Sequence, residues 1–161
     1  TLNSSTGVLV FNAAPDFVKP NRDEASDFAG YAIESADSAA EATRKFFTAG
    51  AKSVAISLGR EGMIWQRAAA GDLFVSQPAP LANCSPVGCG DAALAGFAVA
   101  HERGLSDEET LRLATACGSA NCLADAPGRV DPREVSRLAH EIRVQRIVAC
   151  ECSRSATVEA Q

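Results

Sequence analysis

The sequence predicts an α/β fold of three layers, in which a largely parallel sheet has flanking helices on both faces. Segments with helical periodicity alternate with short apolar segments along the chain, which is the order typical of such folds. Residues 52–58 form a continuous apolar run, as expected for a strand that is buried on both faces of a sheet. The chain has 161 residues, 47% of them hydrophobic, which is enough for one domain with a substantial core.

The first 50 residues are predicted to contain two short strands and two helices. The strands are expected at residues 7–11 and 17–18, and the helices at residues 22–28 and 35–49. In the second helix, Ser38 and Glu41 fit a capping box and Gly50 fits a C-terminal stop. The apolar strand at residues 52–58 then follows.

The second half begins with a turn at residues 59–62 and two strands at 63–67 and 73–76, which Gly71-Asp72 joins as a hairpin. Residues 77–86 contain three prolines and are expected to be a loop. Three helices are expected after this loop, at residues 91–103, from a capping box at 106–109 to about 124, and at 133–142 after Asp131-Pro132. Residues 150–161 have no periodicity and are expected to be a frayed tail.

Composition excludes several classes of function. The net charge is −5 and lysine and arginine form no cluster, so we expect no nucleic-acid partner. We also expect no membrane partner, because no apolar run is long enough to span a bilayer. The first seven residues lack the features of a signal peptide, which favours a cytoplasmic location. A small phosphorylated ligand remains compatible, because backbone N–H groups and a few side chains can bind it.

The six cysteines, at positions 84, 89, 117, 122, 150 and 152, form no C-x-x-C pair, and the chain has two histidines. A zinc site is therefore not expected. Several cysteines lie among alanine and leucine, where a reduced thiol packs as a small hydrophobic group. We expect reduced and mostly structural cysteines.

The strongest chemical signal is the sequence Gly88-Cys89-Gly90-Asp91, which leads directly into an alanine-rich helix. Glycines let the backbone approach a ligand, and the helix start adds partial positive charge, so the segment is suited to an anion such as phosphate. Asp91 at the same helix start could accept a hydroxyl proton, as phosphoryl transfer to an alcohol requires. The alternative is a tight turn in which Asp91 is only the helix N-cap.

This segment resembles the second signature of the ribokinase (PfkB) family of carbohydrate kinases, whose core is G-x-G-D followed by a helix of small residues. The resemblance implies that Gly88, Cys89 and Gly90 form an anion hole for the transferring phosphoryl group. It also implies that Asp91 is the catalytic base. Cys89 departs from the family pattern, which usually has alanine or serine, and its thiol at a helix start is a candidate for oxidation or alkylation.

The segment from Lys19 to Glu24, with Pro20 and Asn21, resembles the N-x-x-E motif of the same family. The resemblance implies that Asn21 and Glu24 act around Mg²⁺ and the phosphates of ATP. Oxygen ligands suit this hard cation. The alternative is that Asn21 caps the following helix and Glu24 lies on the surface.

Two further segments are similar to the nucleotide-binding parts of the family. Ser57, Gly59 and Gly62 match its S/T-x-G-x-x-G turn, for which the alternative is a plain β-turn. Gly118 and Asn121 match its adenine-side helix, which makes them implied nucleotide neighbours. An asparagine inside a helix often has a partner, and solvent is the alternative to ATP.

The resemblance covers about residues 7–148 and is confined to the C-terminal, nucleotide-binding half of a ribokinase-like domain, with 149–161 as a disordered tail. Within the family, the chain most resembles the branch that contains the tagatose-6-phosphate kinases and the 1-phosphofructokinases. The resemblance implies ATP-dependent phosphorylation of a ketohexose phosphate, of the tagatose-6-phosphate or fructose-1-phosphate type, with Mg²⁺.

Family members are much longer, and their N-terminal half supplies most contacts to the sugar. We therefore expect a homo-oligomer or a complementing N-terminal half, because half a sheet exposes an edge or face that another chain can cover. Two alternatives stay open. One is a truncated, non-catalytic nucleotide-binding module, and the other is a ribose or nucleoside kinase of the same superfamily.

Overall fold

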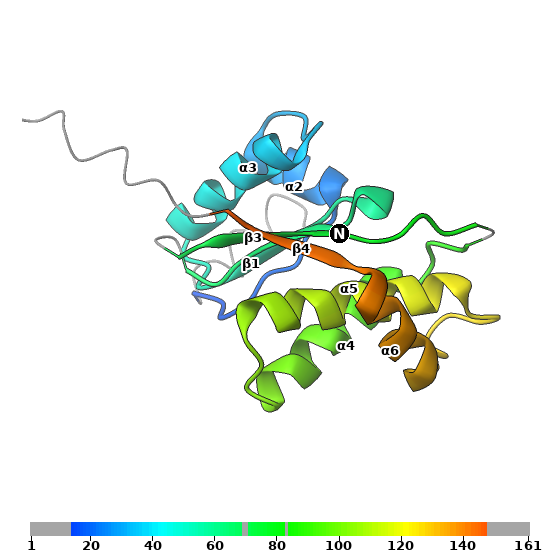
Figure 1. Cartoon of the computed structure of the whole chain (residues 1–161). Helices are drawn as coiled ribbons and strands as arrows, with labels where there is room; N and C mark the ends of the chain where they lie inside the picture. The colour runs from blue at the N-terminus through cyan, green and yellow to red at the C-terminus, as the bar shows by residue number, and fades with distance from the viewer. Residues whose placement is uncertain (1–13, 69–70, 83, 148–161) are drawn as a thin grey trace, which may run out of the picture.

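The computed structural model describes residues 14–68, 71–82 and 84–147, which form a sheet between two layers of helices (Figure 1). The sheet contains, in spatial order, β1 (Val54–Ser57), β2 (Met63–Gln66), β3 (Leu73–Gln77) and β4 (Arg143–Ile147). One face carries α2 (Arg22–Ala29) and α3 (Ala36–Thr48), and the other carries α4 (Cys89–Glu102), α5 (Asp107–Leu123) and α6 (Pro132–Glu141). The predicted α/β class with flanking helices is confirmed, while the strand predicted at 7–11 and the tail at 149–161 lie outside the described residues.

The strand pairings correct the expectation of a largely parallel sheet. Each of the three neighbouring pairs, β1–β2, β2–β3 and β3–β4, is antiparallel. Parallel pairing among the described residues is confined to two isolated bridges, from Val18 to Val54 and from Asn21 to Ser57. For β1–β2 and β2–β3 the physical reason is connection length: a short 3₁₀ turn, η1 (Gly59–Glu61), joins β1 to β2, a short loop joins β2 to β3, and a parallel crossover needs about a dozen residues or more.

Both faces of β1 and β2 are buried, as the apolar run at residues 52–58 predicted. On one face, Ile56 and Ile64 pack in a cluster with Phe46 of α3. On the other, Trp65 packs against Phe97 of α4, with ring centroids 5.0 Å apart. Complete burial of a large apolar side chain stabilises a fold by roughly 1.5–3 kcal/mol, so these two clusters hold the helical layers against the sheet.

The helix starts confirm some caps and correct one. Before α5, Ser106 Oγ accepts a hydrogen bond from the Glu109 amide at 3.3 Å, which is the predicted capping box. Before α3, the box is formed by Ser35 and Ser38, and Glu41 takes no part in it. Since Ser38 already stands in the first turn of α3, its amide is one of those that need a cap, and Ser35 supplies it at 3.2 Å.

The structure differs from the sequence prediction at strand β4 and at the start of α4. Helix α4 begins at Cys89, before the predicted residue 91, because Gly88 is its N-cap. Strand β4 was not predicted. Its residues are largely exposed and polar at the edge of the sheet, so they lack the apolar alternation that would have identified a strand.

No helix in the described ranges combines the length and apolarity needed to cross a bilayer.

Candidate functional site

The start of α4 forms the centre of the candidate site. Gly88 is its N-cap with φ +78°, a left-handed conformation that favours glycine, and no side chain caps this helix start. The first amides of an α-helix have no partner within the helix, so Gly90 and Asp91 can direct N–H groups toward an anion. Asp91 stands in the first turn and is exposed. The alternative in which Asp91 is the N-cap is therefore wrong.

The buried side chain of Asn121 in α5 hydrogen-bonds to this loop. Its side chain is only 2% exposed. The Nδ2 group donates to the carbonyl of Val87 at 2.9 Å and to Cys89 Sγ at 3.4 Å, while Oδ1 accepts from the amide of Gly128 at 2.8 Å. Through these three hydrogen bonds Asn121 connects α5 to the loop and holds the loop in place.

Gly118 lies in the same contact between α5 and the start of α4. A Cβ at Gly118 would lie 3.2 Å from the carbonyl oxygen of Cys89 and 3.6 Å from Ala93 Cβ. The glycine thus lets α5 approach the first turn of α4 closely. Both Gly118 and Asn121 lie close to the predicted anion hole, but in positions that support its backbone.

Lys19 brings a positive charge to the loop from a different part of the chain. A Cβ on Gly90 would lie 3.4 Å from Lys19 Nζ. Burial lowers the pKa of Lys19, and the charges of Glu24 and Asp91 act in the opposite direction. The ammonium group is therefore influenced by carboxylates from two of the predicted motifs. Lys19 was not among the predicted site residues, although its position directly before Pro20-Asn21 was the available signal.

Backbone pairing fixes the segment that carries Lys19. The amide of Val18 donates to Ser53 O at 3.1 Å, and Ser57 donates from its amide to Pro20 O at 3.1 Å. Arg22 then donates to the carbonyl of Leu58 at 3.2 Å. These contacts extend the sheet beside β1 and place two predicted segments, 19–24 and 57–62, next to one another.

Asn21 and Glu24 are engaged with one another at the start of α2. Asn21 Oδ1 accepts from the Glu24 amide at 2.9 Å, and the Asn21 amide donates to Glu24 Oε2 at 3.0 Å. The capping alternative raised from the sequence is thus present. The part of the chain that the structure describes gathers no group of three or more His, Cys, Asp or Glu side chains able to hold a metal. Mg²⁺ often takes one or two carboxylates together with substrate phosphates, so Glu24 fits one ligand of a site that a nucleotide would complete.

The turn at residues 57–62 has an open end and a closed end. Gly59 has φ +64°, and a Cβ there would meet nothing within 4 Å. Gly62 has φ +98°, and a Cβ there would lie 2.0 Å from the carbonyl oxygen of Ser76. Ser57 and Gly59 therefore remain candidates for ligand contact, whereas Gly62 is required by the packing of the turn on β3.

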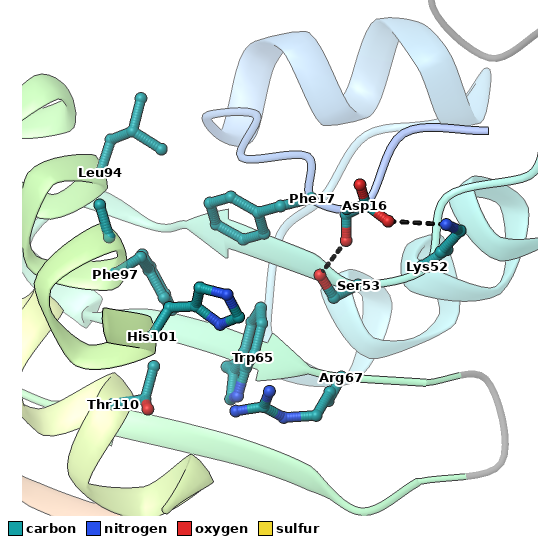
Figure 2. A pocket seen from close by; sticks show the side chains of 11 residues that line it. Asp16, Phe17, Lys52, Ser53, Trp65, Arg67, Leu94, Phe97, His101 and Thr110 are labelled. Carbon is teal, nitrogen blue, oxygen red and sulfur yellow. Dashed lines mark hydrogen bonds and ion pairs between the residues drawn. The ribbon is translucent and has the colours of Figure 1, made fainter. Parts of the chain in front are cut away.

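A cavity of about 350 Å³ lies elsewhere, between the sheet and the outer part of α4 (Figure 2). Phe17, Trp65 and Phe97 form an aromatic wall, with His101 and Arg67 nearby. None of the predicted site residues lines this cavity. We therefore assign the candidate chemistry to the loop before α4, where an uncapped helix start, a carboxylate and an ammonium group meet.

Comparisons with known proteins identify the family to which the chain is similar. Residues 5–132 match the family model described as pfkB family carbohydrate kinase. The 1-phosphofructokinase of Rhodobacter capsulatus is 35% identical over 137 residues, which cover 85% of this chain and 43% of that protein. The 1-phosphofructokinase of Escherichia coli K12 is 32% identical over 145 residues, which cover 89% of this chain and 46% of that protein.

Solved structures show the same fold. A putative phosphofructokinase from Staphylococcus aureus matches with a TM-score of 0.81 and 24% identity, over 89% of this chain and 46% of that one. Phosphofructokinase-2 of E. coli, in complex with substrates and products, matches with a TM-score of 0.76 and 23% identity, over 86% of this chain and 45% of that one. Arabidopsis thaliana ribokinase complexed with ribose and ATP matches with a TM-score of 0.69 and 29% identity, over 77% of this chain and 40% of that one. The chain thus spans less than half the length of the proteins it matches.

Proposed function

This chain belongs to the pfkB family of carbohydrate kinases, and on that premise we propose that it carries the phosphoryl-transfer site of a sugar-phosphate kinase. Asp91 is the proposed base that removes the proton of the attacked hydroxyl. One observation carries this proposal: Asp91 is an exposed carboxylate in the first turn of α4, beside backbone amides that no side chain caps. A general base must lie within hydrogen-bond reach of the proton that it removes, and a hydroxyl attacking a phosphoryl group bound at those amides would meet this condition.

The anion hole is the backbone of Gly88, Cys89 and Gly90, assisted by Lys19. Amides at a helix start favour negative charge, and phosphoryl transfer depends mainly on positioning and on stabilising charge around the moving group. The ammonium of Lys19 lies beside Gly90 and adds a full positive charge to these partial ones. In this structure the amide of Cys89 donates to the carbonyl of Pro86 at 3.3 Å, so it would turn to the phosphoryl group on binding, while its thiol donates to the carbonyl of Ser85 and accepts from Asn121.

ATP is the proposed phosphoryl donor. Family relatives of this fold were crystallised with substrates and products or with ribose and ATP. Ser57 and Gly59 are the proposed nucleotide contacts, since the surroundings of Gly59 are open. Gly62, Gly118 and Asn121 are proposed to act through the backbone that they support. Mg²⁺ would be held by Glu24, oriented by Asn21, together with the ATP phosphates, and would neutralise their charge.

The proposed acceptor is a ketohexose phosphate. The curated relatives at 32–35% identity are named 1-phosphofructokinase, which favours fructose-1-phosphate over tagatose-6-phosphate. Both sugars keep a free hydroxyl and one phosphate, so Asp91 would play the same role with either. A panel that also contains ribose and a nucleoside tests the remaining alternative within the superfamily.

Turnover is proposed to require the part of a family domain that this chain does not span. The chain covers 43% and 46% of two of its curated relatives, and positioning of the acceptor supplies much of the rate in reactions of this kind. That part would supply the missing positioning, whether it belongs to the same polypeptide, to a second copy or to another chain. The alternative function is a nucleotide-binding module without turnover.

The test compares Asp91→Asn with Asp125→Asn, a matched change at another exposed aspartate. ATP consumption is measured with each sugar phosphate, using the chain alone and the chain joined to the remaining half of a family relative. We expect Asp91→Asn to lower turnover at least about a hundredfold with little change in ATP affinity, while Asp125→Asn behaves as the unaltered chain does.

Full turnover in Asp91→Asn would overturn the proposed mechanism. ATP-dependent thermal stabilisation without turnover, in both the isolated and the joined form, would instead support the nucleotide-binding module. The two measurements therefore separate the catalytic function from binding alone.

A further inference from the structure

Three cysteine thiols meet behind the loop that precedes α4. Cys84 and Cys89 lie near enough to Cys122, in the last turn of α5, for their thiols to raise the pKa of the Cys122 thiol. Cys89 Sγ also donates to the carbonyl of Ser85 at 3.3 Å. All three cysteines are free in this structure. The three residues come from the loop, the start of α4 and the end of α5, so the cluster joins the segments that shape the candidate anion hole.

A backbone hydrogen bond holds the segments of Cys84 and Cys122 beside one another. The amide of Ser85 donates to the carbonyl oxygen of Cys122 at 2.9 Å. Each Cα is two bonds from its hydrogen-bonding atom, so the Cα atoms of Cys84 and Cys122 lie within about 8 Å of one another. Disulfides form at Cα separations of about 4–7 Å. Little movement of the exposed loop is therefore needed to join the two sulfur atoms.

Exposure distinguishes the two partners. Cys84 is exposed, whereas Cys122 is partly buried. Burial first, and then hydrogen bonds and charges of its two cysteine neighbours, raise the pKa of Cys122 to about 12, which keeps that thiol protonated at neutral pH. Since an oxidant reacts with accessible thiols, Cys84 is the side chain that it reaches first.

We propose that the cluster is a redox modification site in which a peroxide converts Cys84 and Cys122 into a disulfide. Hydrogen peroxide transfers one oxygen to Cys84, which becomes a sulfenic acid, and the other oxygen leaves as water. Cys122 then gives up its proton and its thiolate attacks the sulfur of the sulfenic acid, and the displaced hydroxide combines with that proton and leaves as a second water. Two thiols are oxidised, one peroxide is reduced, and a thiol reductant restores the starting state.

The disulfide would connect the loop to α5 one residue beyond Asn121. Asn121 donates to the carbonyl of Val87, next to the N-cap Gly88. A covalent link at Cys122 therefore acts on the same support that positions the anion-hole backbone. Its effect on phosphoryl transfer rests on the proposed function, whereas formation of the disulfide does not.

The test uses the full chain carrying Cys150→Ser and Cys152→Ser, which removes the two cysteines outside the described residues. The chain is treated with hydrogen peroxide, its remaining thiols are alkylated, and tryptic peptides are analysed by mass spectrometry. We expect a peptide of residues 68–103 cross-linked to one of residues 113–129, with the loss of two hydrogen atoms and reversal by dithiothreitol.

Each of these two peptides contains two cysteines, so single variants decide the assignment. Cys84→Ser and Cys122→Ser should each abolish the cross-link, whereas Cys89→Ser and Cys117→Ser should each retain it. Cys117 is the matched control, because it is a free cysteine on the same helix as Cys122. Matching thermal unfolding of the reduced variants verifies that they remain folded.

Retention of the cross-link in Cys84→Ser, or its loss in Cys89→Ser, would overturn the assignment. A cross-link between two copies of the chain, or oxidation to sulfonic acid without a cross-link, would overturn the proposed disulfide altogether. Turnover enters none of these measurements, so their failure is distinguishable from failure of the proposed kinase function.

Discussion

Lys19 Nζ lies 3.4 Å from the position that a Cβ on Gly90 would occupy. This contact joins the segment that precedes α2 to the glycine-rich loop that begins α4. The first segment reaches this position because Val18 and Asn21 pair with β1. The ammonium group of Lys19 thereby brings the motif at residues 19–24 to the glycine-rich motif at residues 88–91, next to the exposed carboxylate of Asp91.

Removal of that charge should weaken nucleotide binding. We expect Lys19→Met to lower ATP affinity about ten- to a hundredfold, since a hydrogen bond to a charged group contributes about 1.5–3 kcal/mol. Lys52→Met is the matched control, because Lys52 is exposed and pairs with Asp16 at 2.7 Å. Isothermal titration calorimetry measures both. Equal ATP affinity in the two variants would contradict a role for Lys19 in binding phosphates.

The same variant should change stability in a pH-dependent manner. Burial lowers the pKa of Lys19 below its ordinary value of 10.5, so in the window between the two values the unfolded chain binds more protons than the folded chain. The free energy of unfolding of the natural chain therefore rises with pH in that window. The cost of burying the charge is fully present below the folded pKa and is lost as the pH rises toward 10.5.

We expect Lys19→Met to be more stable than the natural chain at neutral pH, by a margin that shrinks as the pH is raised through the alkaline range. Urea unfolding at a series of pH values measures this difference. Lys52→Met should show no such margin, because Lys52 is exposed. A Lys19→Met margin that stays constant with pH would contradict burial as its cause.

Local signals in the sequence predicted most of the secondary structure. The capping box of Ser106 and Glu109 and the proline after Asp131 each marked a helix start that the structure contains. The glycine-rich loop before α4 was also identified, because its residues are consecutive. Features of this kind depend on neighbouring residues, and their physical chemistry can be read from a short stretch of sequence.

Other features depended on contacts that no local pattern encodes. The strands were assigned individually, but their antiparallel pairing follows from how short connections fold back in space. Asn121 was predicted to be near the nucleotide from its place in a motif, whereas its partners, Val87 and Gly128, are set by tertiary packing. Lys19 reaches Gly90 only after a strand-like segment aligns with β1.

The buried Asn121 should be far more important for stability than the exposed Asn21. Asn121→Ala leaves the amide of Gly128 and the carbonyl of Val87 without their partner, and we expect a loss of roughly 3 kcal/mol in the free energy of unfolding. Asn21→Ala removes a helix cap and should cost about 1 kcal/mol. Urea unfolding compares the two. An Asn121→Ala cost no larger than that of Asn21→Ala would show that the loop is held by other contacts.

Two glycines of one turn should respond differently to the same substitution. Both have positive φ, +64° at Gly59 and +98° at Gly62, so alanine is strained at each. At Gly59 the added Cβ meets nothing within 4 Å, and we expect a cost of roughly 1 kcal/mol. At Gly62 it would lie 2.0 Å from the carbonyl oxygen of Ser76, so the turn must separate from β3, at a cost of about 3 kcal/mol or more. Thermal unfolding of Gly59→Ala and Gly62→Ala gives the comparison, and similar midpoints would mean that the turn relaxes without disturbing the sheet. Because Gly59 is a proposed nucleotide contact and Gly62 a supporting residue, Gly59→Ala should weaken ATP binding while leaving the fold largely stable.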